Sequence, residues 1–178
     1  MHKDCDHILI GEDKIKELVS EIASRINEDY KDKNLLLLGL LKGSVSFMAD
    51  LMKEIKLDIA IDFMDVSSYG AGTESSGRVN ILKDVSQPLE GRDVLIVEDI
   101  IDSGKTLSFI TKYLSTKGAR SVKICTLLSK PSRRVVEIPV DYLGVEIPDE
   151  FVIGYGLDYN ENYRNLPYIG VLKRSVYS

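Results

Sequence analysis

The sequence predicts a single α/β domain in which helices flank a central, mostly parallel sheet. Three observations lead to this fold class. Short apolar runs typical of buried strands alternate with segments whose apolar residues recur at helical spacing. The length of 178 residues corresponds to about one domain and allows a core without disulfides. Because ligands of such sheets bind beyond the carboxyl ends of the strands, we expect the chemistry there.

The first part of the chain predicts two helices and two strands. Apolar side chains recur at three- and four-residue intervals in both helical segments, and Ser44 is the expected N-cap of the second. The apolar run between the helices is nearly continuous, as in a strand that is buried on both faces. In chain order the segments are a helix over 12–30, a strand over 34–41, a helix over 44–55 and a strand over 57–66.

A segment rich in glycine and serine interrupts this alternation. Residues 67–77 contain three glycines, four serines and one threonine, which cannot form a core and predict a flexible loop. Further along, Gly118 is expected to end a helix in the left-handed conformation. The segments after the loop are strands over 79–85 and 94–97, a helix over 106–117, and strands over 121–128, 141–145 and 151–153.

Composition and charge exclude several classes of function. Lys and Arg total 23 against 28 Asp and Glu, a net charge of −5, whereas proteins that coat nucleic acid need a basic surface. The longest apolar run is too short to span a bilayer, and the charged N-terminal residues do not resemble a signal peptide. Cys5 and Cys125 form neither a disulfide framework nor a zinc motif. We therefore expect a cytoplasmic protein that binds neither nucleic acid nor membrane.

The histidine content restricts the possible chemistry. His2 and His7 are the two histidines, and both lie in an N-terminal segment that we expect to be frayed. A Ser-His-Asp triad or an HExxH zinc site requires a histidine within the body of the fold. Any general base is therefore expected to be a carboxylate, a lysine or a tyrosine.

The most informative segment begins at Val94 and reads VLIVEDIIDSGKTL. Its first residues predict a central strand, with two adjacent carboxylates, Glu98 and Asp99, at the carboxyl end. Backbone amides of residues 103–106 at the start of the next helix favour an anion, and Gly104 allows a phosphate to approach closely. The carboxylates could form structural ion pairs or accept the hydroxyls of a ribose. Beside this loop, the pattern favours a ribose 5-phosphate.

A nucleotide-binding P-loop is the main alternative for this segment. Gly104, Lys105 and Thr106 match the second half of the pattern G-x-x-x-x-G-K-[ST]. The first glycine would fall where the chain has Asp99, whose carboxylate would face the phosphates. The motif therefore favours a monophosphate site over a nucleoside triphosphatase.

The stretch EDIIDSGKT from Glu98 to Thr106 resembles the phosphoribosyl-pyrophosphate loop of the type I phosphoribosyltransferases. The whole chain resembles the hypoxanthine(-guanine) phosphoribosyltransferases from end to end. The phosphate loop is typical of the superfamily, whereas four later residues together indicate the 6-oxopurine branch. These are Lys130, Phe151, Asp158 and Arg164; the other matching segments are Leu41-Lys42-Gly43-Ser44, Ser68-Tyr69-Gly70 and Asp158-Tyr159-Asn160.

The resemblance implies an architecture and an activity. A small hood built from the N- and C-terminal segments would cover the core sheet of a single domain over 1–178, with the flexible catalytic loop at about 67–77. The enzyme would serve purine salvage: it would transfer the phosphoribosyl group of phosphoribosyl pyrophosphate to N9 of hypoxanthine, and of guanine, giving IMP or GMP and pyrophosphate. Relatives are commonly homodimers or homotetramers.

The resemblance also implies roles for the acidic residues. Asp102 would take the proton from purine N7 while N9 attacks C1 of the ribose; by itself, Asp102 could equally be an N-cap. Glu98 and Asp99 would hold the ribose hydroxyls directly or through Mg²⁺, with Asp158 as a further metal ligand. Converging carboxylates beside a polyanionic substrate are unfavourable without a divalent cation, and Mg²⁺ suits hard oxygen ligands.

Further roles concern the base and the phosphates. Lys130 would donate to purine O6, although an isolated lysine after a strand is usually only solvated, and Phe151 would stack on the base. The glycine- and serine-rich loop would exclude water from an oxocarbenium-like transition state. The remaining expected substrate contacts are Leu41, Lys42, Gly43, Ser68, Tyr69, Ser103, Gly104, Lys105, Thr106, Val152 and Arg164, whereas Tyr155, Tyr159 and Tyr163 are interpreted as packing residues.

Two other functions remain open. The same fold serves in regulators that sense phosphoribosyl pyrophosphate or nucleotides, but such a protein should carry a basic surface or an added DNA-binding domain. A transferase for adenine, orotate or xanthine is the other alternative. Lys130 and Phe151 disfavour adenine and orotate, and xanthine only modestly.

Overall fold

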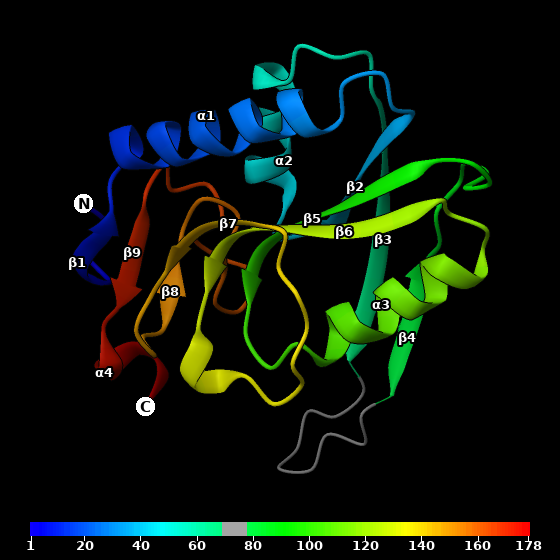
Figure 1. Ribbon diagram of the computed structural model, residues 1–178. Coiled ribbons are helices and arrows are strands. Elements are labelled where there is room, and N and C mark those ends of the chain that lie inside the picture. Colours follow the sequence, from blue (N-terminus) through cyan, green and yellow to red (C-terminus); the bar gives the residue numbers. More distant parts are fainter. Residues whose placement is uncertain (69–77) are drawn as a thin grey trace.

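The computed structural model describes residues 1–68 and 78–178 of the chain. Figure 1 shows a six-stranded sheet with the order β4-β3-β2-β5-β6-β7 and, beside it, a three-stranded sheet with the order β1-β9-β8. In the large sheet, the described pairings are parallel except for the one between β3 and β4. The predicted α/β fold with a central, mostly parallel sheet is therefore confirmed.

The helices and strands follow one another in the alternating order that the sequence predicts. The helices are α1 (Glu12–Asp29), α2 (Val45–Glu54), α3 (Lys105–Thr116) and α4 (Arg174–Tyr177), with one 3-10 turn, η1 (Pro131–Arg133). The strands are β1 (Cys5–Ile10), β2 (Leu35–Leu41), β3 (Ala60–Ser68), β4 (Val79–Lys83), β5 (Asp93–Ile101), β6 (Ser121–Ser129), β7 (Tyr142–Glu146), β8 (Val152–Ile153) and β9 (Ile169–Leu172).

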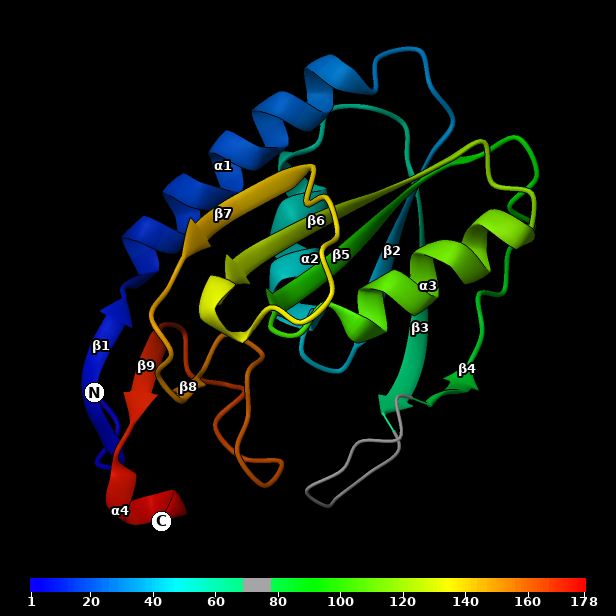
Figure 2. The same ribbon diagram turned by 60° about the horizontal axis from the view of Figure 1, so that its bottom comes forward.

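Helices cover both faces of the large sheet. Figures 1 and 2 show α1 and α2 on one face and α3 on the other. Within β2, Leu35 and Leu37 belong to the α1–α2 layer, whereas Leu36 and Leu38 belong to the α3 layer. Successive strand residues point to opposite faces, so a strand with helices on both sides is apolar throughout. Burying one such leucine stabilises the fold by roughly 1.5–3 kcal/mol.

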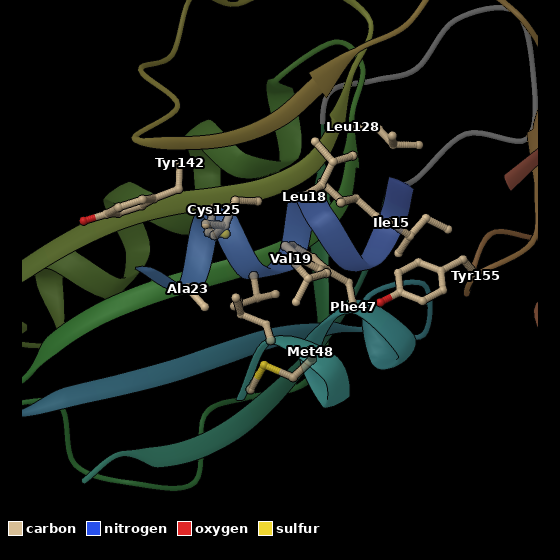
Figure 3. Close-up of a cluster of buried hydrophobic side chains, with 14 of the residues drawn as sticks. Ile15, Leu18, Val19, Ala23, Phe47, Met48, Cys125, Leu128, Tyr142 and Tyr155 are labelled. Atoms are coloured by element: carbon tan, nitrogen blue, oxygen red, sulfur yellow. The ribbon is translucent and has the colours of Figure 1, made fainter. Parts of the chain in front are cut away.

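The α1–α2 layer also anchors a distant part of the chain. Figure 3 shows Ile15 and Leu18 of α1 close to Phe47 of α2, with Tyr155 at the edge of the same cluster. The hydroxyl of Tyr155 donates a hydrogen bond to Asp50 of α2 over 2.6 Å. The segment that follows β8 is therefore fixed to the main core.

The small sheet joins the two ends of the chain, because β1 and β8 both pair antiparallel with β9. Buried Cys5 lies opposite Leu172, and the backbone nitrogen of His2 donates to the Tyr168 hydroxyl over 2.7 Å. The prediction of a frayed N-terminal segment, which carries His2 and His7, is therefore wrong. Pairing with a strand more than 150 residues away orders this segment, and no local pattern indicates such a partner.

Three local predictions differ from the structure. β5 continues to Ile101, so Glu98 and Asp99 lie within the strand and not at its end. β3 continues to Ser68, where it pairs with Val79, so the predicted loop begins later. Its remaining residues, 69–77, lie outside the described residues.

The helix ends also differ from expectation in one case. Ser44 is the N-cap residue of α2, as predicted, but its side chain makes no capping hydrogen bond. Gly118 has φ +87° after α3, as predicted. Throughout 1–68 and 78–178, no helix is both long and apolar enough to cross a bilayer.

Candidate active site

A cavity of about 210 Å³ lies at the carboxyl ends of β2 and β5, beside the start of α3. In both ribbon views β5 and β6 end on the side of the small sheet (Figures 1 and 2). The structure brings together at this cavity six residues that the sequence analysis names as site candidates. They are Leu41, Glu98, Asp102, Ser103, Gly104 and Thr106.

The backbone of the phosphate loop, residues 102–106, is held by the segment that follows η1. The carbonyl oxygen of Ser103 accepts hydrogen bonds from the amides of Val135 and Val136, both over 3.0 Å. Gly104 has φ +81°, which glycine adopts without the penalty of a side chain. A Cβ at Gly104 would also overlap the backbone oxygen of Val136. Glycine is therefore required here for two reasons.

The N-terminus of α3 is open toward an anion. Gly104 is the N-cap of α3 and has no side chain with which to cap it. Lys105 begins the helix, and its amide donates to the Ser103 hydroxyl over 3.3 Å. Uncapped first-turn amides and the helix dipole together favour a bound phosphate.

Asp102 lies two residues before this N-cap. Because Gly104 occupies the capping position, the alternative interpretation of Asp102 as a helix cap is wrong. The side chain of Asp102 is exposed at the cavity, and its backbone oxygen accepts a hydrogen bond from Nε of Arg134 over 3.0 Å. A carboxylate held by its backbone, with its side chain free to reach a ligand, suits proton transfer.

Glu98 and Asp99 form a pair of carboxylates on β5. Burial, and then the neighbouring Asp99, raise the pKa of Glu98 well above its usual range. Glu98 accepts a hydrogen bond from the amide of Asp99, and Asp99 accepts one from the amide of Ile100. Neither carboxylate has a basic partner among the residues that the structure describes. The alternative of structural ion pairs is therefore wrong.

The loop after β2 is wedged between β5 and the segment that follows β8. The peptide bond between Leu41 and Lys42 is cis. A Cβ at Gly43 would overlap the carboxylate of Asp99, and a Cβ at Gly156 would overlap the carbonyl oxygen of Gly43. The two glycines thus allow three distant segments to meet at the site.

Charged side chains of the 154–164 segment form a network above this loop. Nη2 of Arg164 lies 3.1 Å from both Asp158 and Glu161, and its Nη1 donates to the Gly156 carbonyl oxygen over 2.7 Å. Glu161 also pairs with Nζ of Lys42 over 2.6 Å, and these contacts hold the pKa of Glu161 below its usual range. Glu161 therefore bridges the two cations that were expected to bind pyrophosphate.

Sequence reasoning missed Glu161. Its one signal is its place directly after the Asp158-Tyr159-Asn160 motif. The φ of Glu161 is +63°, in the left-handed region, as is that of Asn160 at +49°. No sequence pattern predicts this backbone turn, which directs the carboxylate of Glu161 toward Lys42.

Lys130 is buried and not merely solvated. Its side chain is 10% exposed, and Nζ lies 4.0 Å from Asp149, a residue that sequence reasoning also missed. The Lys130 amide donates to the carbonyl oxygen of Ile101 over 3.0 Å, so the lysine begins beside the end of β5. A partly desolvated ammonium near a cavity is a directed hydrogen-bond donor.

The aromatic candidate lies at the start of the small sheet. Phe151 is half-buried, and its ring contacts Tyr159 edge-on and Tyr177 face-on. Val152, the next residue, is buried in β8. Tyr159 and Tyr163 pack against the cluster around Ile153, and Tyr155 against the main core, so the prediction that these three tyrosines are packing residues is confirmed.

The carboxylates do not form a ready-made metal cluster. In residues 1–68 and 78–178, no group of three or more His, Cys, Asp or Glu side chains is arranged to hold a metal ion. Asp158 instead pairs with Arg164 and accepts the amide of Glu161 over 2.9 Å. The expected convergence of Glu98, Asp99 and Asp158 is therefore wrong for the protein alone.

A magnesium ion can nevertheless suit this site. Mg²⁺ is usually held by one or two carboxylates together with substrate phosphates. Glu98 and Asp99 offer two carboxylates without a cationic partner among the described residues, and burial and the neighbouring Asp99 raise the pKa of Glu98. The donors thus fit a metal that arrives with a phosphorylated substrate.

One of the two last candidates lies at the end of β3. Ser68 is the final residue of this strand. Tyr69 lies outside the described residues.

Comparison with known proteins defines the class first. A family model described as "Phosphoribosyl transferase domain" matches residues 10–160. The fold, the uncapped α3 and the paired carboxylates agree with that class.

The relatives are more specific. The chain is 56% identical over 178 residues to a hypoxanthine-guanine phosphoribosyltransferase of Staphylococcus epidermidis, which covers 100% of this chain and 99% of that protein. A solved hypoxanthine phosphoribosyltransferase from Staphylococcus aureus has a TM-score of 0.97 at 52% identity, covering 100% of this chain and 97% of that one. A solved hypoxanthine-guanine phosphoribosyltransferase from Bacillus anthracis has a TM-score of 0.91 at 44% identity, and the match covers 95% of this chain and 99% of that one. The chain belongs to the hypoxanthine-guanine phosphoribosyltransferase family, as its sequence motifs predict.

Proposed function

We propose that this enzyme transfers the 5-phosphoribosyl group of phosphoribosyl pyrophosphate to N9 of hypoxanthine, and of guanine. The products are IMP or GMP and pyrophosphate, which places the reaction in purine salvage. The observation that carries this proposal is the cavity that combines an uncapped helix N-terminus with carboxylates lacking a basic partner among the described residues. That combination suits a phosphorylated sugar with free hydroxyls.

The sugar phosphate is held by backbone and carboxylates. Amides of the phosphate loop, from Ser103 to Thr106, bind the 5-phosphate, with the dipole of α3 behind them. Glu98 and Asp99 accept the two ribose hydroxyls, which are hydrogen-bond donors. A carboxyl group can accept a hydrogen bond whether it is protonated or ionised. The contact between Glu98 and a ribose hydroxyl is therefore possible in either protonation state of Glu98.

Protein groups recognise the purine base through contacts with its edge and with its ring face. Lys130 donates a hydrogen bond to O6, which hypoxanthine and guanine possess and adenine lacks. Phe151 stacks on the ring, and the backbone of Val152 contacts its edge. The burial of Lys130 supports this role, because a donor with little water around it discriminates strongly between an oxygen and an amino group.

Asp102 moves the proton. As N9 attacks C1 of the ribose, the exposed carboxylate of Asp102 accepts the proton of N7. The position of this carboxylate at the cavity supports the assignment, and the described part of the fold offers no histidine near β5. In the reverse direction the same group returns the proton.

The leaving pyrophosphate lies against the loop of Leu41, Lys42 and Gly43, and Arg164 completes this subsite. Binding must draw Lys42 and Arg164 away from Glu161, because both cations pair with it. Mg²⁺, held by substrate oxygens and one or two of the carboxylates, would supply charge stabilisation for the departing pyrophosphate.

The organisation of the protein completes the proposal. Residues 1–178 act as one domain in which the small sheet is the hood, and Ser68, at the end of β3, and Tyr69 contact the substrates. We also propose a cytoplasmic homodimer or homotetramer. Buried, unpaired Cys5 and Cys125 suit a reducing compartment. Light scattering on the purified chain tests the oligomer, and a monomer at micromolar concentration would contradict it.

A product assay tests the activity. The purified chain is incubated with phosphoribosyl pyrophosphate and hypoxanthine, guanine, xanthine or adenine, with Mg²⁺ or with a chelator. We expect nucleotide from hypoxanthine and guanine in the presence of Mg²⁺. Product from adenine alone would contradict the base assignment. Binding of phosphoribosyl pyrophosphate without turnover of any base would favour a regulator.

Ligand-dependent stability tests the phosphate loop separately. At about a hundred times its dissociation constant, phosphoribosyl pyrophosphate with Mg²⁺ should stabilise the fold by about 2.7 kcal/mol. ATP should do much less, because Asp99 stands where a P-loop has glycine. Equal shifts of the melting temperature with both ligands would contradict the monophosphate site.

A further inference from the structure

The ring of Phe151 is held by two tyrosines from different parts of the chain. Tyr177, the last residue of α4, stacks on it with centroids 4.9 Å apart and an interplanar angle of 28°. Tyr159 meets it edge-on, at 5.5 Å and 87°. Sequence reasoning assigned no role to Tyr177, and the proposed mechanism does not use it.

Tyr177 is not a core residue. Its side chain is 37% exposed, and the ring contact that the structure gives it is with Phe151. Its hydroxyl has no hydrogen bond among the described residues. The ring face, and not the hydroxyl, is thus what Tyr177 contributes.

The position of α4 is fixed independently of the large sheet. The Lys173 amide donates to the carbonyl oxygen of Asp4 over 2.9 Å, and Nζ of Lys173 donates to that of Lys3 over 2.7 Å. One residue earlier, the Leu172 amide donates to the carbonyl oxygen of Phe151 over 2.8 Å. These bonds tie the start of the helix to the residues just before β1 and to the residue whose ring Tyr177 covers.

We infer that Tyr177 is a positioning residue for the purine: it covers one face of Phe151 and holds that ring so that the opposite face receives the base. The inference rests on the proposed function, in which Phe151 stacks on the base. An aromatic ring has two faces, and a neighbour on one of them restricts the tilt of the ring. A ring already fixed in its bound orientation loses less freedom when the base arrives.

Kinetics of variants at position 177 test this inference. Tyr177→Ala should raise KM for hypoxanthine about three- to tenfold, the range expected for one aromatic pair, with KM for phosphoribosyl pyrophosphate unchanged. Tyr177→Phe keeps the ring and should rescue the KM. Tyr177→Leu keeps apolar bulk without a flat ring, so its KM for hypoxanthine should lie between those of Tyr177→Ala and Tyr177→Phe.

A double-mutant cycle separates this inference from the proposed function. Phe151→Leu should raise KM for hypoxanthine, and adding Tyr177→Ala to it should have no further effect, because the ring to be positioned is gone. An unchanged KM in Phe151→Leu would refute the stacking role itself. A normal response to Phe151→Leu with no effect of Tyr177→Ala would refute only the positioning role.

Three further outcomes would overturn it. A lower KM in Tyr177→Ala would mean that Tyr177 occupies the face that the base needs. A fall in melting temperature with equal changes in both KM values would mean a purely structural role. Failure of Tyr177→Phe to rescue would mean that the hydroxyl matters.

Discussion

The phosphate loop and the 154–164 segment meet at the same site but are built differently. The phosphate loop takes consecutive residues, and backbone hydrogen bonds such as those to the carbonyl oxygen of Ser103 hold its shape. The 154–164 segment depends on distant partners: Tyr155 bonds to Asp50 of α2, and Glu161 pairs with Lys42 after β2. Both regions have partners that are distant in the chain, but the phosphate loop is held through its backbone, whereas the 154–164 segment is held mainly through its side chains.

The difference has a chemical consequence. The phosphate loop presents backbone amides at the start of α3, where Gly104 supplies no capping side chain and the Lys105 amide donates to the Ser103 hydroxyl of the same loop. In the 154–164 segment, Arg164 already pairs with Asp158 and Glu161, so a pyrophosphate must displace carboxylates. Changes near the phosphate loop should therefore have larger effects than changes in the charge network.

The largest effect is expected at Asp102. Asp102→Asn keeps the size of the side chain but removes the basic oxygen, so the single-turnover rate should fall by roughly 10²- to 10⁴-fold. Melting temperature should hardly change, because Gly104 and not Asp102 caps α3. Full activity of the variant would refute the assignment of the general base.

The contact between the 154–164 segment and the loop after β2 is tested at Gly156. Its φ is +99°, and a Cβ would overlap the carbonyl oxygen of Gly43. Gly156→Ala should therefore lower the free energy of unfolding by roughly 2–5 kcal/mol, as a left-handed alanine costs about 1–2 kcal/mol and overpacking adds about 1–3 kcal/mol. Urea unfolding measures this change.

Gly91 provides the matched control for that variant. Its φ is +73°, and a Cβ there would meet nothing within 4 Å. Gly91→Ala should show only the backbone cost of about 1–2 kcal/mol. Equal decreases in the free energy of unfolding for the two variants would mean that the close approach of Gly156 to Gly43 does not affect stability.

Lys130 tests recognition of the base edge. Lys130→Met removes the donor to O6 at similar length and should raise KM for hypoxanthine and guanine roughly tenfold or more, since hydrogen bonds involving a charged group contribute about 1.5–3 kcal/mol. The melting temperature should be kept, because Nζ has one distant partner, Asp149 at 4.0 Å. Unchanged KM values for both bases would show that Lys130 does not contact the purine.

The smallest effect is expected at Glu161. Glu161→Gln removes the charge that competes for Lys42 and Arg164, so KM for phosphoribosyl pyrophosphate should fall by about two- to fivefold, the range of exposed ion pairs. The decrease should shrink at high salt. A higher KM would mean instead that Glu161 holds the two cations in place for the substrate.

Local patterns predicted the regions in which short-range forces dominate. The apolar run of β2, the amphipathic α1 and the glycine after α3 all appear where periodicity and turn chemistry indicated. The strand ends that were predicted wrongly depend on pairing with a neighbouring strand. β5 extends through Glu98 and Asp99 because β6 continues beside it as far as Ser129.

The sequence by itself determined the fold class, the family and the phosphate loop, because these depend on residues that are neighbours in the chain. Only the tertiary structure decided that the N-terminus forms β1 against β9, that Glu161 bridges Lys42 and Arg164, and that Tyr177 covers Phe151. Such contacts join residues as far apart in the chain as Cys5 and Leu172. Their geometry follows from how two sheets and their connecting turns pack together, which no short stretch of sequence encodes.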